Sequence, residues 1–226
     1  MNKTLAVVSL ERGSGKSTLA LNIASLLFSR DSPSSSVLLL DMDFQGGGVT
    51  KLLGLVSLPY SISHLTNGTL HPLETAYRHP VGFHIIPNFC EHKKYSSSML
   101  TKNLQKLENS LIVIDSNSGN GLIGTLELAD NFIIIGKDVP KIKQLSMVIE
   151  NNGKTVLGAV LNNISSLSTT KTEEIERKLG KKVIGVIPAH KAVREANSQN
   201  QPVSYLYGEC LPVKKFRNII SNLDVV

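Results

Sequence analysis

Cysteine is scarce in this chain, and its scarcity excludes several classes of protein. The 226 residues contain two cysteines, Cys90 and Cys210, which lie far apart and form no Cys-x-x-Cys pair. This spacing argues against a disulfide scaffold, a zinc site and a chain-bridging iron–sulfur cluster. The fold is therefore expected to depend on a hydrophobic core, for which an apolar fraction of 41 % is sufficient.

Long apolar runs are also lacking. No stretch approaches the roughly 20 residues that a membrane-spanning helix needs, and the apolar run near the start of the chain is too short for a signal peptide. We therefore expect a cytoplasmic protein, with a peripheral position at the membrane as the alternative. The length suits one globular domain covering residues 1–226.

No part of the chain carries a strong excess of one charge. The formal net charge is +6, but residues 1–113 hold 10 Lys and Arg against 7 Asp and Glu, and the remaining residues hold 14 against 11. A basic domain or tail would indicate a polyanionic partner. Because none stands out, we expect a generally basic protein rather than a dedicated binder of nucleic acid or of an anionic membrane surface.

Seven short apolar runs predict a β-sheet. They cover residues 4–10, 37–41, 83–87, 111–115, 131–135, 155–162 and 182–188. Because these runs are continuously apolar rather than alternating, they suit strands that are covered on both faces. Helical patterns over 17–30, 97–109 and 169–179 lie between them. The alternation predicts an α/β fold with a doubly wound, mainly parallel sheet and helices on both faces.

The stretch SLERGSGKST, residues 9–18, has the order in which a phosphate-binding loop works: strand, glycine-rich loop, Lys-Ser and helix. Gly13 and Gly15 allow backbone N–H groups to turn toward phosphate oxygens. Lys16 would reach the β- and γ-phosphates, and Ser17 would ligate Mg²⁺. The strict pattern GxxxxGK[ST] fails because Leu10 stands at its first glycine. A chance Gly-Lys-Ser in a loop is the alternative.

Residues 13–17 resemble the second half of KGGxGK[ST], the deviant phosphate loop of the MinD/ParA family of P-loop nucleotide-binding proteins. Later segments are similar to further family motifs and follow in the same order. They are VLLLDMDFQGGGVTKLLG (37–54), LIVIDSNSGNG (111–121), ADNFIIIGKDVPKIKQ (129–144), LGAVLNNI (157–164) and VIGVIPAHKAVREANSQNQPV (183–203). Within the family, the MinD branch looks closer than the DNA-partitioning branch.

This resemblance implies that ATP or ADP is bound together with Mg²⁺. It places nucleotide contacts at Gly13, Ser14, Gly15, Lys16, Ser17, Thr18, Asn162 and Pro188. Asn162 would read adenine, for which its amide offers both a donor and an acceptor. Ser17 and Asp115 would hold the metal, Asp41 would touch it through water, and Asp43 would orient the attacking water. Carboxylates gathered at strand ends are costly without a cation, which favours a Mg²⁺ site.

Glu11 departs from the family pattern. It stands at the first lysine of KGGxGK[ST], which in the family crosses a dimer to the partner's phosphates. An anion there removes an attraction to the triphosphate and adds a repulsion. Three explanations are open. Arg12 takes the role of that lysine, or Glu11 bonds Arg12 or another neighbour and faces away, or the site has lost most of its ATP turnover. The catalytic candidates are therefore Lys16, Asp43, Glu11 and Arg12. We expect a weak ATPase with slow or impaired hydrolysis.

The resemblance also implies a homodimer in the ATP state that positions an unidentified protein partner, as in cell division, partitioning or localisation. The alternative is a nucleotide-binding scaffold or adaptor that does not hydrolyse ATP. A P-loop kinase is disfavoured, because no lid segment rich in arginine is visible.

The last residues, LPVKKFRNIISNLDVV, predict an amphipathic helix. Its apolar face comprises Val213, Phe216, Ile219, Ile220 and Leu223. A basic amphipathic helix can lie on an anionic membrane, but this stretch occupies the place of the family's final core helix, so we expect it to pack. Lysines and glutamates interleave over residues 171–195, so we expect a mixed-charge surface there rather than a DNA-binding patch.

Overall fold

The computed structural model contains the predicted sheet and describes residues 2–28, 36–44, 48–89, 96–117, 122–164 and 167–223. All seven expected strands are present: β1 (Lys3–Val8), β2 (Ser36–Met42), β4 (His84–Ile86), β5 (Ser110–Ser116), β6 (Asn131–Gly136), β7 (Thr155–Asn162) and β8 (Val183–Ile187). A two-residue strand, β3 (Tyr77–Arg78), is additional to the predicted ones. Cys90 and residues 29–35, 45–47 and 118–121 lie outside the described residues.

The strands form one eight-stranded sheet in the order β3-β4-β2-β5-β1-β6-β7-β8. Neighbouring strands are parallel, except that β3 runs antiparallel to β4 at one edge. The strand order reverses at β1, the strand that leads into the glycine-rich loop. Ligands bind at such switch points, outside the carboxyl ends of the strands.

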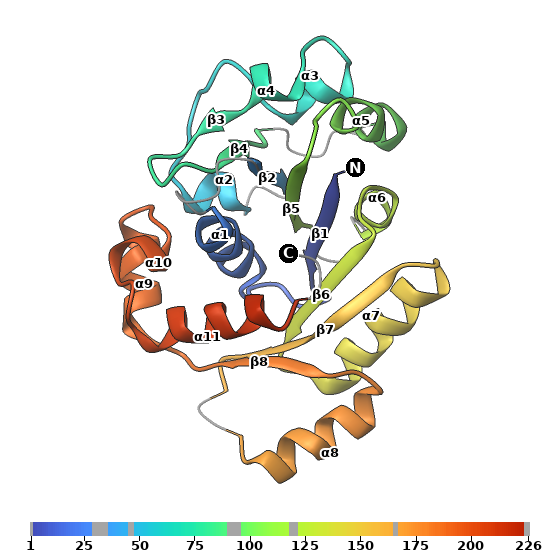
Figure 1. Cartoon of the computed structure of the whole chain (residues 1–226), viewed down its shortest axis with the longest axis vertical. Coiled ribbons are helices and arrows are strands. Elements are labelled where there is room, and N and C mark those ends of the chain that lie inside the picture. Colours follow the sequence, from blue (N-terminus) through green and yellow to red (C-terminus); the bar gives the residue numbers. More distant parts are fainter. Residues whose placement is uncertain are drawn as a thin grey trace.

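Helices cover both faces of the sheet, which confirms the predicted doubly wound architecture (Figure 1). One face carries α1 (Lys16–Leu27), α9 (Lys191–Ser198), α10 (Val203–Leu206) and α11 (Leu211–Ser221); the other carries α5 (Ser97–Leu104), α6 (Leu122–Leu128) and α7 (Val139–Asn151). Helix α8 (Thr169–Leu179) packs beside α7. Three short helices, α2 (Val49–Leu52), α3 (Ile62–Thr66) and α4 (Pro72–Thr75), lie between β2 and β3.

Two predicted helices end earlier than their apolar patterns suggest. Helix α1 ends at Leu27 rather than at residue 30, and α5 ends at Leu104 rather than at 109. The amide of Asn2 donates to the carbonyls of Leu104 and Leu107, at 3.0 and 2.8 Å. It thereby satisfies acceptors that a continuing helix would have bonded itself, so Leu107 packs into the core from a turn.

The C-terminal helix packs as predicted. Helix α11 lies against β8 and α1, and the side chains of Val213, Phe216 and Ile219 are at most 1 % exposed. Gly185 of β8 makes room for this contact, because a Cβ there would overlap Ile219. In the described part of the chain, no helix has both the length and the apolar character needed to cross a membrane.

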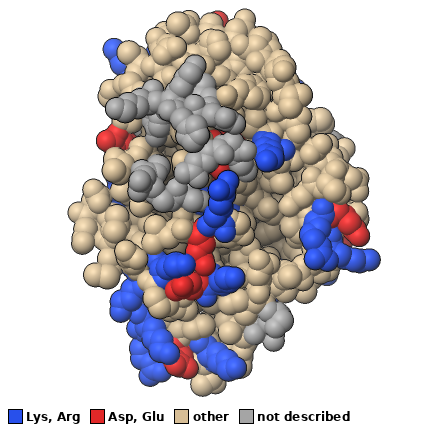
Figure 2. Space-filling model, turned by 180° about the vertical axis from the view of Figure 1, so that it is seen from behind, with Lys and Arg blue, Asp and Glu red and all other residues tan. Residues whose placement is uncertain are grey.

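Charged side chains of both signs interleave on the face shown in Figure 2. Within α8, Lys178 pairs with Glu174 at 2.6 Å, and Lys181 just beyond it pairs with Glu150 of α7. Two of the basic residues of this region therefore form ion pairs with acidic neighbours, in agreement with the expected mixed-charge surface.

Candidate functional site

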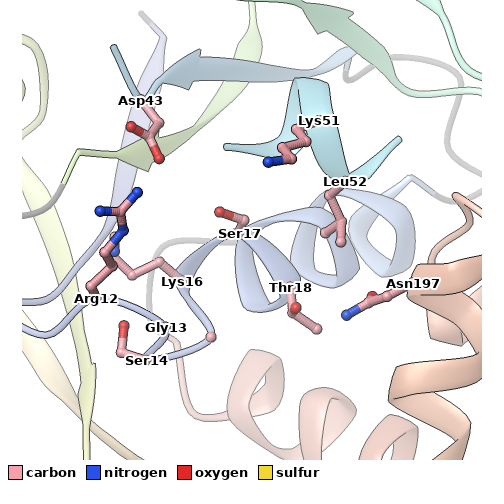
Figure 3. A pocket seen from close by; sticks show the side chains of 11 residues that line it. Arg12, Gly13, Ser14, Lys16, Ser17, Thr18, Asp43, Lys51, Leu52 and Asn197 are labelled. Carbon is pink, nitrogen blue, oxygen red and sulfur yellow. The ribbon is translucent and has the colours of Figure 1, made fainter. Parts of the chain in front are cut away.

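The loop between β1 and α1 forms the floor of a cleft at the carboxyl edge of the sheet. The cleft has a volume of about 510 Å³. It is lined by Arg12, Gly13, Ser14, Gly15, Lys16, Ser17, Thr18, Asp43, Lys51, Leu52 and Asn197. Figure 3 shows these side chains around one open space at the start of α1. The structure thus brings together all the loop residues predicted to contact phosphate.

Two glycines give the loop its curvature. Gly13 and Gly15 have φ angles of +69° and +95°, in the left-handed region that glycine adopts without strain. At Gly15 the backbone also approaches a neighbour, because a Cβ there would overlap the side-chain amide of Asn162. The loop therefore requires glycine at residue 15 for both conformation and space.

Lys16 begins α1 and is nearly buried, with 7 % of its surface exposed. Burial lowers its pKa, while the nearby carboxylates Asp115 and Asp43 act to raise it. The start of a helix also carries a partial positive charge. An anion in the cleft would therefore meet the lysine and the N-terminus of α1 together.

Two buried aspartates lie beneath the cleft. Asp41 of β2 and Asp115 of β5 are direct partners in the parallel register, and each is at most 1 % exposed. Asp41 accepts hydrogen bonds from the backbone N–H groups of Asp43 and Thr50, both at 2.8 Å. Asp115 accepts from the Val49 N–H at 3.0 Å. The two carboxylates thus hold the start of α2.

Burial raises the pKa of Asp41 to about 6, although hydrogen bonds from Thr50 and Asp43 act to lower it. Burial also raises the pKa of Asp115, and the charge of Asp41 adds to that effect. One oxygen of Asp115, Oδ1, has no hydrogen-bond partner. A buried acid pair with an unpaired oxygen is a place where a bound cation is favourable.

The Ser17 hydroxyl lies beside Asp115 and acts to lower the pKa of that carboxyl group. Within the described ranges, no group of three or more His, Cys, Asp or Glu side chains is arranged to hold a metal ion. Mg²⁺ in phosphate sites is usually held by one or two protein ligands, waters and the phosphates themselves. Ser17 and Asp115 fit that pattern, whereas both oxygens of Asp41 accept backbone N–H groups.

Arg12 and Asp43 lie on facing sides of the cleft, with the guanidinium directed toward the carboxylate (Figure 3). The side chain of Arg12 is exposed, and no other described residue bonds it within ion-pair distance. The guanidinium is therefore available to an anion in the cleft.

Glu11 does not line this cleft. Its carboxylate accepts a hydrogen bond from the Lys137 N–H at 3.0 Å, just after β6, and its own N–H donates to Ser9 Oγ. A Cβ at Gly136 would stand 2.7 Å from the Glu11 carboxylate, so that glycine leaves room for it. Of the three alternatives raised by the sequence, this geometry agrees with Glu11 bonded to a neighbour and turned away.

A smaller cleft of about 150 Å³ adjoins the first one and shares Gly15 and Thr18 with it. Asn162 and Pro188 line it, as do Asn163 and His190. The amide nitrogen of Asn162 donates to the Ser14 carbonyl at 2.7 Å. The two positions predicted to contact the base therefore lie together, beside the glycine-rich loop.

Several lining residues were not among the sequence candidates. In the larger cleft they are Lys51, Leu52 and Asn197. Lys51 had a detectable signal, because it is the single charge in the otherwise uncharged stretch 44–73, directly after Asp43. Asn197 lies far along the chain and is brought in by the packing of α9 and α10 near α1.

The chain matches the model of the CobQ/CobB/MinD/ParA nucleotide binding domain over residues 5–203. An uncharacterised ATP-binding protein of Methanocaldococcus jannaschii is 24 % identical over 233 residues, covering 97 % of this chain and 86 % of that protein.

Solved structures of the same architecture are similar along nearly the whole chain. The septum site-determining protein MinD of Pyrococcus horikoshii, complexed with Mg-ADP, has a TM-score of 0.84 at 19 % identity, covering 99 % of this chain and 96 % of that one. A chain of the MinC:MinD cell division protein complex of Aquifex aeolicus has a TM-score of 0.79 at 19 % identity, covering 97 % of this chain and 94 % of that one. With most of its length matched by the family model, this chain belongs to the CobQ/CobB/MinD/ParA family of nucleotide-binding domains.

Proposed function

We propose that this protein is a nucleotide-dependent switch that binds ATP or ADP with Mg²⁺, pairs with a second copy in the ATP state and positions a partner protein. The observation that carries the proposal is the larger cleft, where Lys16, Ser17 and the glycine-rich loop surround one space above the buried Asp115. Loop amides, a helix N-terminus and one lysine are the groups that bind a polyphosphate.

The assignment of the two clefts follows from their contacts. The phosphates would lie over residues 13–18, and the base would lie in the smaller cleft beside Asn162 and Pro188. Mg²⁺, when bound, would neutralise phosphate charge and polarise the phosphoryl group. Ser17 and Asp115 would hold it, and Asp43 would orient a water at the end of the phosphate tail.

Slow hydrolysis is part of the proposal. The Glu11 carboxylate accepts a hydrogen bond from the Lys137 N–H and is therefore turned away from the proposed phosphate site. A glutamate also offers no positive charge to the phosphates of a partner subunit. Arg12 is the cationic side chain of the loop that faces the cleft beside Lys16. Lost transition-state cations of this kind reduce phosphoryl-transfer rates by several orders of magnitude.

The same observation favours a second candidate, a scaffold that binds nucleotide and pairs without hydrolysing it. The partner role itself is proposed by analogy, since one structural neighbour is a MinC:MinD complex. Phosphate release separates the two candidates: slow Mg²⁺-dependent release supports the switch, and none supports the scaffold.

Light scattering after gel filtration tests the proposal. The wild-type chain is expected to be monomeric without nucleotide and with ADP, and dimeric with a non-hydrolysable ATP analogue and Mg²⁺. Lys16→Ala should abolish nucleotide binding and dimerisation, whereas Lys106→Ala, at an exposed lysine far from the cleft, should change neither. Nucleotide binding that does not depend on Lys16 would refute the assignment of the site. Binding without pairing would refute the dimeric switch.

A further inference from the structure

Lys51 gives the cleft a cation from outside the phosphate loop. It lies on α2, on the wall opposite Arg12, and Figure 3 shows its ammonium group directed into the space above the Ser17 hydroxyl. Its side chain is exposed, and among the described residues no carboxylate lies within 4.0 Å of it. Its ammonium group is therefore not neutralised by an ion pair within the described residues.

The backbone that presents Lys51 is fixed from below. The two residues before it, Val49 and Thr50, donate their N–H groups to the buried carboxylates of Asp115 and Asp41. The side-chain hydroxyl of Thr50 also accepts from the Asn88 N–H at 2.8 Å. A buried polar network of this kind holds its backbone in one place. The ammonium is therefore aimed into the cleft by a rigid support, with only its own side chain to order on binding.

The charge balance of the cleft indicates the ligand chemistry. Its lining side chains include three cations, Arg12, Lys16 and Lys51, against the single carboxylate of Asp43. An ammonium group is a compact point charge that binds phosphate oxygens without a fixed direction. Since the smaller cleft beside Asn162 offers room for the base, the space before Lys51 belongs to the phosphate end of a nucleotide.

We propose that Lys51 binds the β- and γ-phosphates from the side opposite the loop, so that α2 senses how many phosphates the nucleotide carries. This proposal rests on the proposed nucleotide-binding function. Helix α2 would then distinguish ATP from ADP through Lys51. This residue belongs neither to the glycine-rich loop nor to the carboxylates beneath the cleft.

Isothermal titration calorimetry with ATP, ADP and AMP in the presence of Mg²⁺ tests the proposal. Lys51→Gln should weaken ATP binding about tenfold, equivalent to about 1.4 kcal/mol. It should weaken ADP binding less and leave AMP binding unchanged, and the loss should shrink as salt is raised. Lys51→Arg keeps the charge and should bind ATP nearly as the wild type does. Lys102→Gln makes the same charge change on α5, across the sheet, and should alter none of the three affinities.

Each result of the calorimetry either supports or overturns the proposed role of Lys51. An ATP affinity in Lys51→Gln equal to that in Lys102→Gln would overturn the proposal and leave Lys51 as a solvated side chain. An equal loss for AMP would also overturn it, because Lys51 would then contact the nucleoside. If the wild-type chain binds none of the three nucleotides, the proposed function itself fails. Thermal unfolding of each variant without ligand shows whether the fold is retained.

Discussion

Gly15→Ala, compared with Gly13→Ala, separates conformational strain from steric contact in the glycine-rich loop. Gly15 has φ +95° and ψ +14°, and a side chain in the left-handed region costs about 1–2 kcal/mol. The new Cβ would also overlap the Asn162 amide and displace it from the Ser14 carbonyl, to which it now donates at 2.7 Å. Losing that hydrogen bond costs about 1 kcal/mol more. We expect the free energy of unfolding to fall by about 2–3 kcal/mol in total.

Gly13→Ala is the matched control. Gly13 is also left-handed, with φ +69°, but a Cβ there meets nothing within 4 Å. It should therefore cost only the conformational part, about 1–2 kcal/mol. Urea denaturation of the nucleotide-free protein measures both changes on the same scale.

A double-mutant cycle isolates the contact. In an Asn162→Ala background the displaced amide is absent, so Gly15→Ala should cost no more than Gly13→Ala does. If the extra loss at Gly15 persisted in that background, the Asn162 contact would not be its cause. Equal losses for the two glycines in the wild-type background would likewise refute the reasoning.

Three further predictions concern other parts of the molecule. Glu11→Lys removes the acceptor of the Lys137 N–H and should cost about 1–2 kcal/mol of stability in urea. It should also raise steady-state phosphate release, and an unchanged or lower rate would count against the role given to this position. Phe216→Ala should lower the free energy of unfolding by about 3–5 kcal/mol, because the ring is 1 % exposed on α11; a loss below about 1 kcal/mol would contradict its place in the core. Burial lowers the pKa of His79 below its usual 6.5, so the unfolded chain binds the proton more readily. Stability should therefore decline as the pH falls below 6.5, and His79→Asn, followed by urea denaturation at each pH, should reduce that decline.

The sheet was largely predictable, because strands buried on both faces need continuous apolar runs and the chain has few others. The bounds of α8 were equally clear: Ser168 caps its start, and Gly180, with φ +67°, ends it. The glycine-rich loop was identified because its residues are contiguous, and the structure places them in one cleft. Each of these signals is local in sequence, so the order of residues alone contains it.

Contacts between residues far apart in the chain were harder to predict from the sequence. The bond from Lys137 to Glu11 spans 126 positions and exists because β1 and β6 are neighbours in the sheet. Helix α7 was not assigned from the sequence, although Asp138 caps it and its buried residues follow a helical spacing. Asp41 was predicted to contact the metal through water, and its hydrogen bonds from the backbone N–H groups of residues 43 and 50 were not foreseen. The sequence identifies such a carboxylate as a candidate but does not show which backbone groups donate hydrogen bonds to it.

The bond between Glu11 and Lys137 has a mechanical consequence. Lys137 is the residue directly before the cap of α7, so the glycine-rich loop and the first turn of that helix are joined by one short link. A displacement of the start of α7 would therefore act directly on Glu11, two residues before Gly13 of the glycine-rich loop. Under the proposed function, the exit of β6 would therefore connect the nucleotide cleft with α7 without a large rearrangement.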